Sequence, residues 1–194
     1  MKAFKSRPRT SFEKLAKLTS TDTGVRLVGK MLVIDPKSNT RVLTDHEGNL
    51  LMVDTEAGRV GRLSITLQGP KLKEHLGAND NGYKVSWAKI DGKRATIFHH
   101  QLICWLVHGP AVGEAKIPNH MDLNRANNSR DNLEWVDNGQ NVTHGYVANR
   151  LLALGYSNAL GYLKHPLSIR QIEEYNQPLN TDRDFHAFAK WLGW

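Results

Sequence analysis

The dipeptide Asp91-Gly92 is the local signal that most restricts how this chain can fold. It separates two short segments, 83–90 and 93–98, that are rich in residues favouring strands. Asp-Gly tolerates the positive φ angles of a two-residue type I′ turn, which joins neighbouring antiparallel strands. After Phe98 the apolar residues recur at about the 3.6-residue period of a helix, and Gly109-Pro110 ends the pattern. A β-hairpin followed at once by a helix is therefore the central expectation.

The segments before this hairpin predict an antiparallel β-meander. Four β-rich runs are separated by turn residues, and they cover 25–34, 41–44, 50–53 and 59–67. At the start of the chain, Thr10 and Glu13 form a capping box, which predicts a short helix over 11–18.

The segments after the hairpin predict two short strands, a helix over about 138–154 and a two-helix tail. The tail helices are expected because Ser168 with Gln171 and Thr181 with Asp184 form capping boxes. The fold class is α+β: a meander and hairpin, a core of mixed strands and helix, and a small helical tail. The expected divisions are 1–24 (basic arm and short helix), 25–80 (β-rich region), 81–154 (core) and 155–194 (helical tail).

Charge and cysteine content narrow the classes of function. The 194 residues contain 26 Lys and Arg against 19 Asp and Glu, a net charge of +7. Most of this excess lies in the first 30 residues, which suits either an arm that follows a phosphate backbone or a solvated tail. The single cysteine, Cys104, excludes an intrachain disulfide and a Cys-x-x-Cys zinc site, so no structural zinc is expected. We find neither a secretory signal nor an apolar run of ~20 residues, and expect a cytoplasmic protein that does not enter membranes.

Residues 117–144 carry the chemistry, because Asn, Asp and His are crowded there between apolar anchors. His120 is expected at the end of one strand and Asn132 at the start of the next. Asn141 and His144, three residues apart, share one face of the following helix. If these side chains converge, the imidazole offers a base for water and the helix offers ligands for a cation, as metal-assisted phosphodiester hydrolysis requires.

Several parts of the sequence, in order, resemble the HNH endonucleases of the bacteriophage homing type. These parts are Gly82-Tyr-Lys-Val through Phe98-His-His-Gln-Leu-Ile, Asn119-His-Met-Asp-Leu-Asn, Asn127-Asn, Asn132-Leu-Glu-Trp-Val and Asn141. The resemblance implies the ββα-metal fold, in which a hairpin and a helix hold one divalent metal. It also implies that His120 is the general base, that Asn119 and Asn141 are metal ligands, and that Asn132 ties the loop to the hairpin. Many relatives have Asp at the position of Asn119. His100 matches a recurrent histidine and is expected to support the site.

The sequence therefore predicts a metal-dependent DNA endonuclease in which His120 and Asn132 form the catalytic set. The metal ligands are expected to be Asn119, Asn141 and His144, with Mg²⁺ or another divalent cation such as Mn²⁺. Double-stranded DNA is the expected partner, and the sequence leaves open a monomer or a homodimer. The cations expected to contact DNA are Lys84, Lys89, Lys93, Arg94, Arg125 and Arg130. Two alternatives remain: a DNA-binding protein that keeps the HNH scaffold without turnover, and a structural or host-interaction protein.

Overall fold

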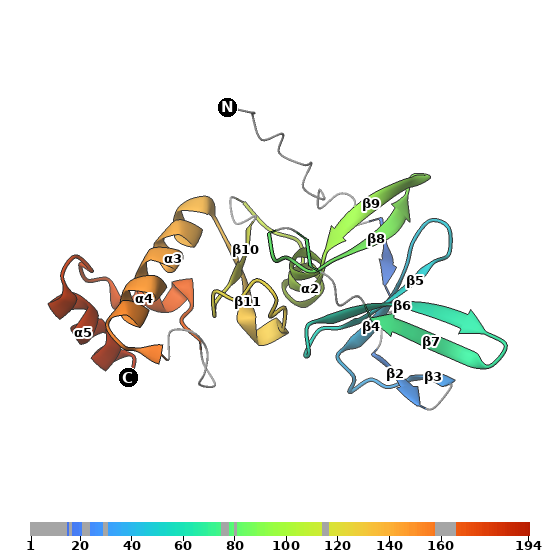
Figure 1. The fold of residues 1–194 in the computed structure, drawn as a ribbon, viewed down its shortest axis with the longest axis horizontal. Coiled ribbons are helices and arrows are strands. Elements are labelled where there is room, and N and C mark those ends of the chain that lie inside the picture. Colours follow the sequence, from blue (N-terminus) through green and yellow to red (C-terminus); the bar gives the residue numbers. More distant parts are fainter. Residues whose placement is uncertain are drawn as a thin grey trace.

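The computed structural model describes residues 15, 17–20, 24–28, 31–74, 78–79, 81–113, 117–157 and 166–194. Figure 1 shows an antiparallel sheet at one end of the molecule, with a hairpin above it, and helices at the other end; a helix and a second two-stranded unit lie between the two ends. This mixture confirms the α+β class. Within the described ranges, no helix combines the length and apolar character needed to cross a bilayer.

The sheet has the strand order β1-β4-β5-β6-β7, with every neighbouring pair antiparallel. Its strands are β1 (Thr19–Ser20), β4 (Thr40–Thr44), β5 (Leu50–Asp54), β6 (Arg59–Thr66) and β7 (Gly69–Glu74). The expected run 25–34 is a separate hairpin of β2 (Val25–Val28) and β3 (Met31–Ile34). The meander is thus confirmed, but the sequence did not predict β7. Pro70 donates no backbone hydrogen bond, and β7 accommodates it as an edge strand.

The hairpin expected around Asp91-Gly92 is present as β8 (Val85–Ile90) and β9 (Lys93–Phe98). Asp91 and Gly92 adopt φ angles of 52° and 71°, as the two-residue turn requires. Helix α2 (His99–His108) follows without a break and ends at Gly109, whose φ is 75°. Both expectations from this segment are confirmed.

A second antiparallel pair, β10 (Ile117–His120) and β11 (Leu133–Val136), is joined by a long loop that ends in the 3₁₀ turn η1 (Arg130–Asn132). Helix α3 (Asn138–Ala153) comes next, and α4 (Ile169–Tyr175) and α5 (Asp182–Trp191) form the tail. Ser168 and Thr181 cap the two tail helices as expected. The helix expected over 11–18 lies largely outside the described residues.

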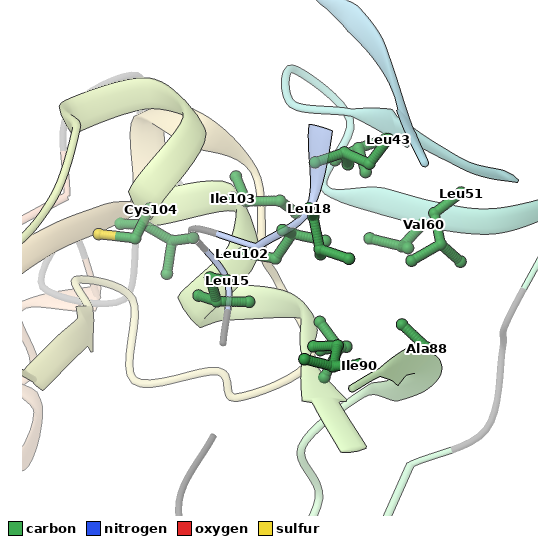
Figure 2. Close-up of a cluster of buried hydrophobic side chains, with 13 residues drawn as sticks. Leu15, Leu18, Leu43, Leu51, Val60, Ala88, Ile90, Leu102, Ile103 and Cys104 are labelled. Carbon is green, nitrogen blue, oxygen red and sulfur yellow. The ribbon is translucent and has the colours of Figure 1, made fainter. Parts of the chain in front are cut away.

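Two buried cores hold these elements together. In the first, drawn in Figure 2, side chains of the sheet pack against β8, β9, α2 and β11; Leu43, Ala88 and Ile103 represent the sheet, the hairpin and α2. In the second, Val147 and Leu151 of α3 pack with Phe185 and Phe188 of α5. The first core extends across the expected divisions after residues 24 and 80, and the second across the division after residue 154. The first core thus includes β11, and the four-part division stays a prediction.

Candidate active site

The loop between β10 and β11, which we call the site loop (residues 121–132), is held by the carboxylate of Asp122. This carboxylate accepts hydrogen bonds from Asn127 Nδ2 at 2.7 Å and Asn132 Nδ2 at 2.8 Å. Asn132 Oδ1 in turn accepts from the Asp122 backbone N–H at 2.9 Å. Both ends of the Asn132 amide are therefore engaged within the loop. We assign Asn132 to holding the loop, as the resemblance implied, and withdraw it from the catalytic set.

His120, at the end of β10, has one ring nitrogen fixed by the site loop. Its Nε2 lies 2.9 Å from Asn128 Oδ1. An amide oxygen can only accept, so Nε2 carries the proton and Nδ1 keeps its lone pair. Burial lowers the pKa of His120 below 6.5, while the bond to Asn128 and the nearby Asp122 carboxylate act in the opposite direction. The imidazole is therefore mainly neutral at pH 7, as a general base must be.

Two aromatic side chains, His100 of α2 and Tyr83 just before β8, lie beside His120. The His100 ring centroid lies 5.3 Å from that of His120, and the Tyr83 centroid lies 4.8 Å from His100 and 6.1 Å from His120. The Arg125 guanidinium lies over the Tyr83 ring at 5.1 Å and donates to the Asn81 carbonyl at 3.3 Å. His100 therefore packs directly beside the candidate base. Tyr83 was missed as a site residue, although it lies inside the segment that carries the family resemblance.

Asn119, the residue before His120, contacts β11 and not the site loop. Its Nδ2 donates to Glu134 Oε1 at 2.9 Å, from the residue directly opposite on β11. The same Glu134 oxygen accepts from the Ile169 N–H at 3.1 Å. Because the amide nitrogen is committed to Glu134, the Asn119 Oδ1 is the atom left to act as a ligand. Neither Glu134 nor its bridge to the tail was expected from the sequence.

The donor set fits a hard divalent cation, because Mg²⁺ and Mn²⁺ prefer oxygen ligands. Asn119 provides one such oxygen. Asn141 lies in the first turn of α3, half-buried, on a helix that contacts β10. Across the described ranges, no three His, Cys, Asp or Glu side chains lie where they could together hold a metal ion. The candidate site therefore depends on amide oxygens, and the meeting of Asn119 and Asn141 at one cation remains a proposal.

His144 lies on α3 and binds the tail through one of its two ring nitrogens. Its side chain is fully buried, and its Nε2 donates to the Leu167 carbonyl at 2.8 Å in the segment that leads into α4. Burial lowers the pKa of His144, so the ring is neutral and bound to the tail. The spacing of three residues from Asn141 was read as a shared ligand face. Because the other ring nitrogen, Nδ1, is buried and has no hydrogen-bond partner among the described residues, its lone pair is uncommitted, and the ligand role of His144 stays a prediction.

The six cations expected to contact DNA have different surroundings. Arg94 and Lys93 are exposed on the hairpin, and Lys84 is half-buried at its base. Lys89 forms an ion pair with Glu47 at 3.2 Å. Arg130 donates to Asn39 Oδ1 at 3.1 Å, on the N-terminal sheet. Arg130 is therefore bound to protein, and the hairpin cations together with Arg125 remain the candidates for DNA contact.

Trp87 of β8 contacts two arginine side chains. The Arg62 guanidinium lies over its ring at 3.8 Å and the Arg94 guanidinium at 4.8 Å, so two cations from different strands share one indole. Stacking of this kind holds a guanidinium in place while its N–H groups remain able to bind an anion. Exposed Lys73 lies opposite Arg62 on β7. Neither Trp87 nor Arg62 was among the residues expected from the sequence to contact DNA.

Comparison with known families identifies the segment that carries these features. Residues 98–143 match the family model described as HNH endonuclease. This segment is therefore similar to the HNH endonuclease domain, a class of nuclease domain. The match includes α2, β10, the site loop, β11 and the start of α3. No curated protein and no solved structure matches the chain.

Proposed function

We propose that the protein is a metal-dependent endonuclease that hydrolyses DNA phosphodiester bonds, with His120 as its general base. The observation that carries the proposal is the bond between His120 Nε2 and Asn128 Oδ1, which leaves Nδ1 as the basic atom, inside the segment that matches the HNH family. The lowered pKa of His120 supports this role, since the base must be neutral to accept a proton.

In the proposed reaction, His120 Nδ1 removes a proton from water, and the resulting hydroxide attacks the scissile phosphorus in line with the leaving 3′ oxygen. The bond between the phosphorus and the 3′ oxygen breaks, that oxygen takes a proton from solvent water, and the products are a 5′-phosphate and a 3′-hydroxyl. Asn119 and Asn141 would hold the cation through their side-chain oxygens. When bound, Mg²⁺ or Mn²⁺ supplies a Lewis acid that offsets the charge developing on the phosphate and the leaving oxygen.

The duplex is proposed to lie across the site loop and the hairpin. Arg125, stacked on Tyr83 beside His120, is the cation best placed to hold a phosphate near the base. Arg94 and Arg62 on Trp87 extend the positive surface along the hairpin. Contacts of this kind bind the backbone without reading sequence. A single site cuts one strand, so we expect nicking by a monomer and double-strand cleavage by a homodimer or by two successive events.

The test uses supercoiled plasmid, with Mg²⁺, Mn²⁺ or EDTA, and compares the wild type with His120→Ala. His186→Ala is a matched control, because His186 is exposed on α5, and we expect it to cut like the wild type. Cleavage that requires the cation and disappears only in His120→Ala supports the proposal. Cleavage that survives in His120→Ala refutes it.

A second candidate function is a DNA-binding protein that keeps the HNH scaffold without turnover. The uncharged Asn119 motivates it, because an amide oxygen contributes less than a carboxylate to holding a cation. The same assay separates the two, since this candidate shifts DNA in a mobility assay but leaves plasmid intact with every cation. A relation to homing endonucleases is part of our proposal and rests on the sequence resemblance alone.

A further inference from the structure

The turn between β5 and β6, residues 55–58, lies against the backbone of the site loop. Gly58 has a φ of 65°, and a Cβ added to it would lie 2.3 Å from the Asn128 carbonyl carbon and 2.5 Å from the Ser129 nitrogen. Real Cβ atoms essentially never approach closer than 3.0 Å. The peptide group between Asn128 and Ser129 therefore occupies the place of the missing side chain, and only glycine permits this contact.

Hydrogen bonds fix the same contact on the far side of that peptide. The Arg130 N–H donates to the Thr55 carbonyl at 2.9 Å, and Arg130 Nη1 donates to Asn39 Oδ1 at 3.1 Å. Thr55 is itself held by its hydroxyl, which donates to the Asn39 carbonyl at 2.8 Å. The turn 55–58 and Asn39, just before β4, thus contact three consecutive residues of the site loop, 128–130.

The first of these residues is the one that fixes the candidate base. Asn128 is only 1% exposed, and its Oδ1 holds the Nε2–H of His120 at 2.9 Å. A displacement of the Asn128 backbone would carry this oxygen away from the ring. The sheet lies outside residues 98–143, the part of the chain that matches the HNH family.

We infer that the turn 55–58 of the N-terminal sheet positions the general base, by pressing Gly58 against the Asn128 peptide so that Asn128 holds His120 in one tautomer and orientation. The inference rests on the proposed function, because it assigns the turn to that same site. Gly58 and Asn128 act on the substrate only through His120, so both are positioning residues.

The test compares Gly58→Ala with Gly48→Ala. Gly48 also has a positive φ, 77°, and also lies in a turn of this sheet, but a Cβ there meets nothing within 4 Å. Both variants therefore carry the backbone cost of alanine at positive φ, and only Gly58→Ala disturbs the site loop. Asn128→Ala, which removes the acceptor itself, completes the set.

Two readouts are measured on the full chain. One is the solvent-protected Nε2–H signal of His120 in ¹H–¹⁵N NMR spectra, which needs neither cation nor DNA. The other is plasmid cleavage, analysed as kcat and KM. We expect Gly58→Ala and Asn128→Ala to lose the signal and to lower kcat by about 10²-fold with KM unchanged. Gly48→Ala should keep the signal and the wild-type kcat.

The inference is overturned if Gly58→Ala keeps both the signal and the kcat of Gly48→Ala. If Gly58→Ala does not fold, Asn39→Ala replaces it in the test, because this variant removes the hydrogen bond to Arg130 without introducing a clash. Loss of the His120 signal in Asn39→Ala supports the inference. Full retention of the signal overturns it. A wild type that shows the protected signal but cuts no DNA would refute the proposed function and leave the positioning contact supported.

Discussion

Replacing Glu134 with glutamine tests how the candidate metal ligand Asn119 is oriented. Oε1 of Glu134 accepts from Asn119 Nδ2 at 2.9 Å and from the Ile169 N–H at 3.1 Å. Hydrogen bonds to a charged acceptor contribute about 1.5–3 kcal/mol and neutral ones about 1 kcal/mol. Glutamine keeps one acceptor oxygen but not the charge. We therefore expect Glu134→Gln to lower the free energy of unfolding by about 2 kcal/mol, and the melting temperature by about 4–8 °C.

The same change should weaken metal binding. The glutamine amide can present its nitrogen to Asn119, and Asn119 would then rotate and turn its own nitrogen toward the cation. Loss of a residue that orients a ligand typically costs 10–100-fold in metal affinity. Isothermal titration with Mn²⁺, without DNA, measures this effect directly.

Glu174→Gln is the matched control. Glu174 forms an exposed ion pair with Arg170 on α4, and such pairs contribute little to stability, so neither Mn²⁺ affinity nor melting temperature should change appreciably. If Glu134→Gln binds Mn²⁺ like the wild type and melts at the same temperature, Glu134 does not orient Asn119 and this reasoning is refuted.

Three further predictions follow from the site. Because the folded pKa of His144 lies below 6.5, the unfolded chain binds more protons below that pH. The contribution of neutral His144 to the free energy of unfolding is therefore fully present above pH 6.5 and is lost as the pH falls through the folded pKa. Thermal melts against pH should show this decline, and His144→Gln should flatten it; identical curves would contradict it. Trp87→Ala should weaken DNA binding and reduce its salt dependence, since Arg62 and Arg94 lose their support; fluorescence anisotropy with salt titration measures both, and an unchanged affinity would argue against this surface. Asn119→Asp should tighten Mn²⁺ binding in calorimetry, and weaker binding would mean that Asn119 is not a ligand.

Features governed by neighbours in the chain were predictable from the sequence. The Asp91-Gly92 turn, the end of α2 at Gly109 and the capping boxes of α4 and α5 involve residues within a few positions of each other, so local backbone preferences decide them. The strand β7 was missed because Pro70 argues against a central strand, and only the sheet order shows that this strand lies at an edge.

Roles that depend on distant partners could not be predicted in the same way. Arg130 looked like a free loop cation, but its partner Asn39 lies 91 residues away. His144 had the spacing of a ligand beside Asn141, but the sequence could not show that the Leu167 carbonyl binds its Nε2 and leaves only Nδ1 for that role. In both cases a partner from another part of the chain determines which atoms of the side chain remain available.

The sequence by itself predicted the class of chemistry: a histidine at a strand end, asparagines at fixed spacing after it, and a hairpin and helix before it. Tertiary structure decided which atoms are available for that chemistry. Asn128 selects the basic nitrogen of His120, Glu134 leaves the oxygen of Asn119 free, and Gly58 supports Asn128 from a strand pair far away in sequence. The physical reason is that spacing fixes only the direction of a side chain along its own element, whereas a hydrogen bond also requires a partner that packing brings within about 3 Å.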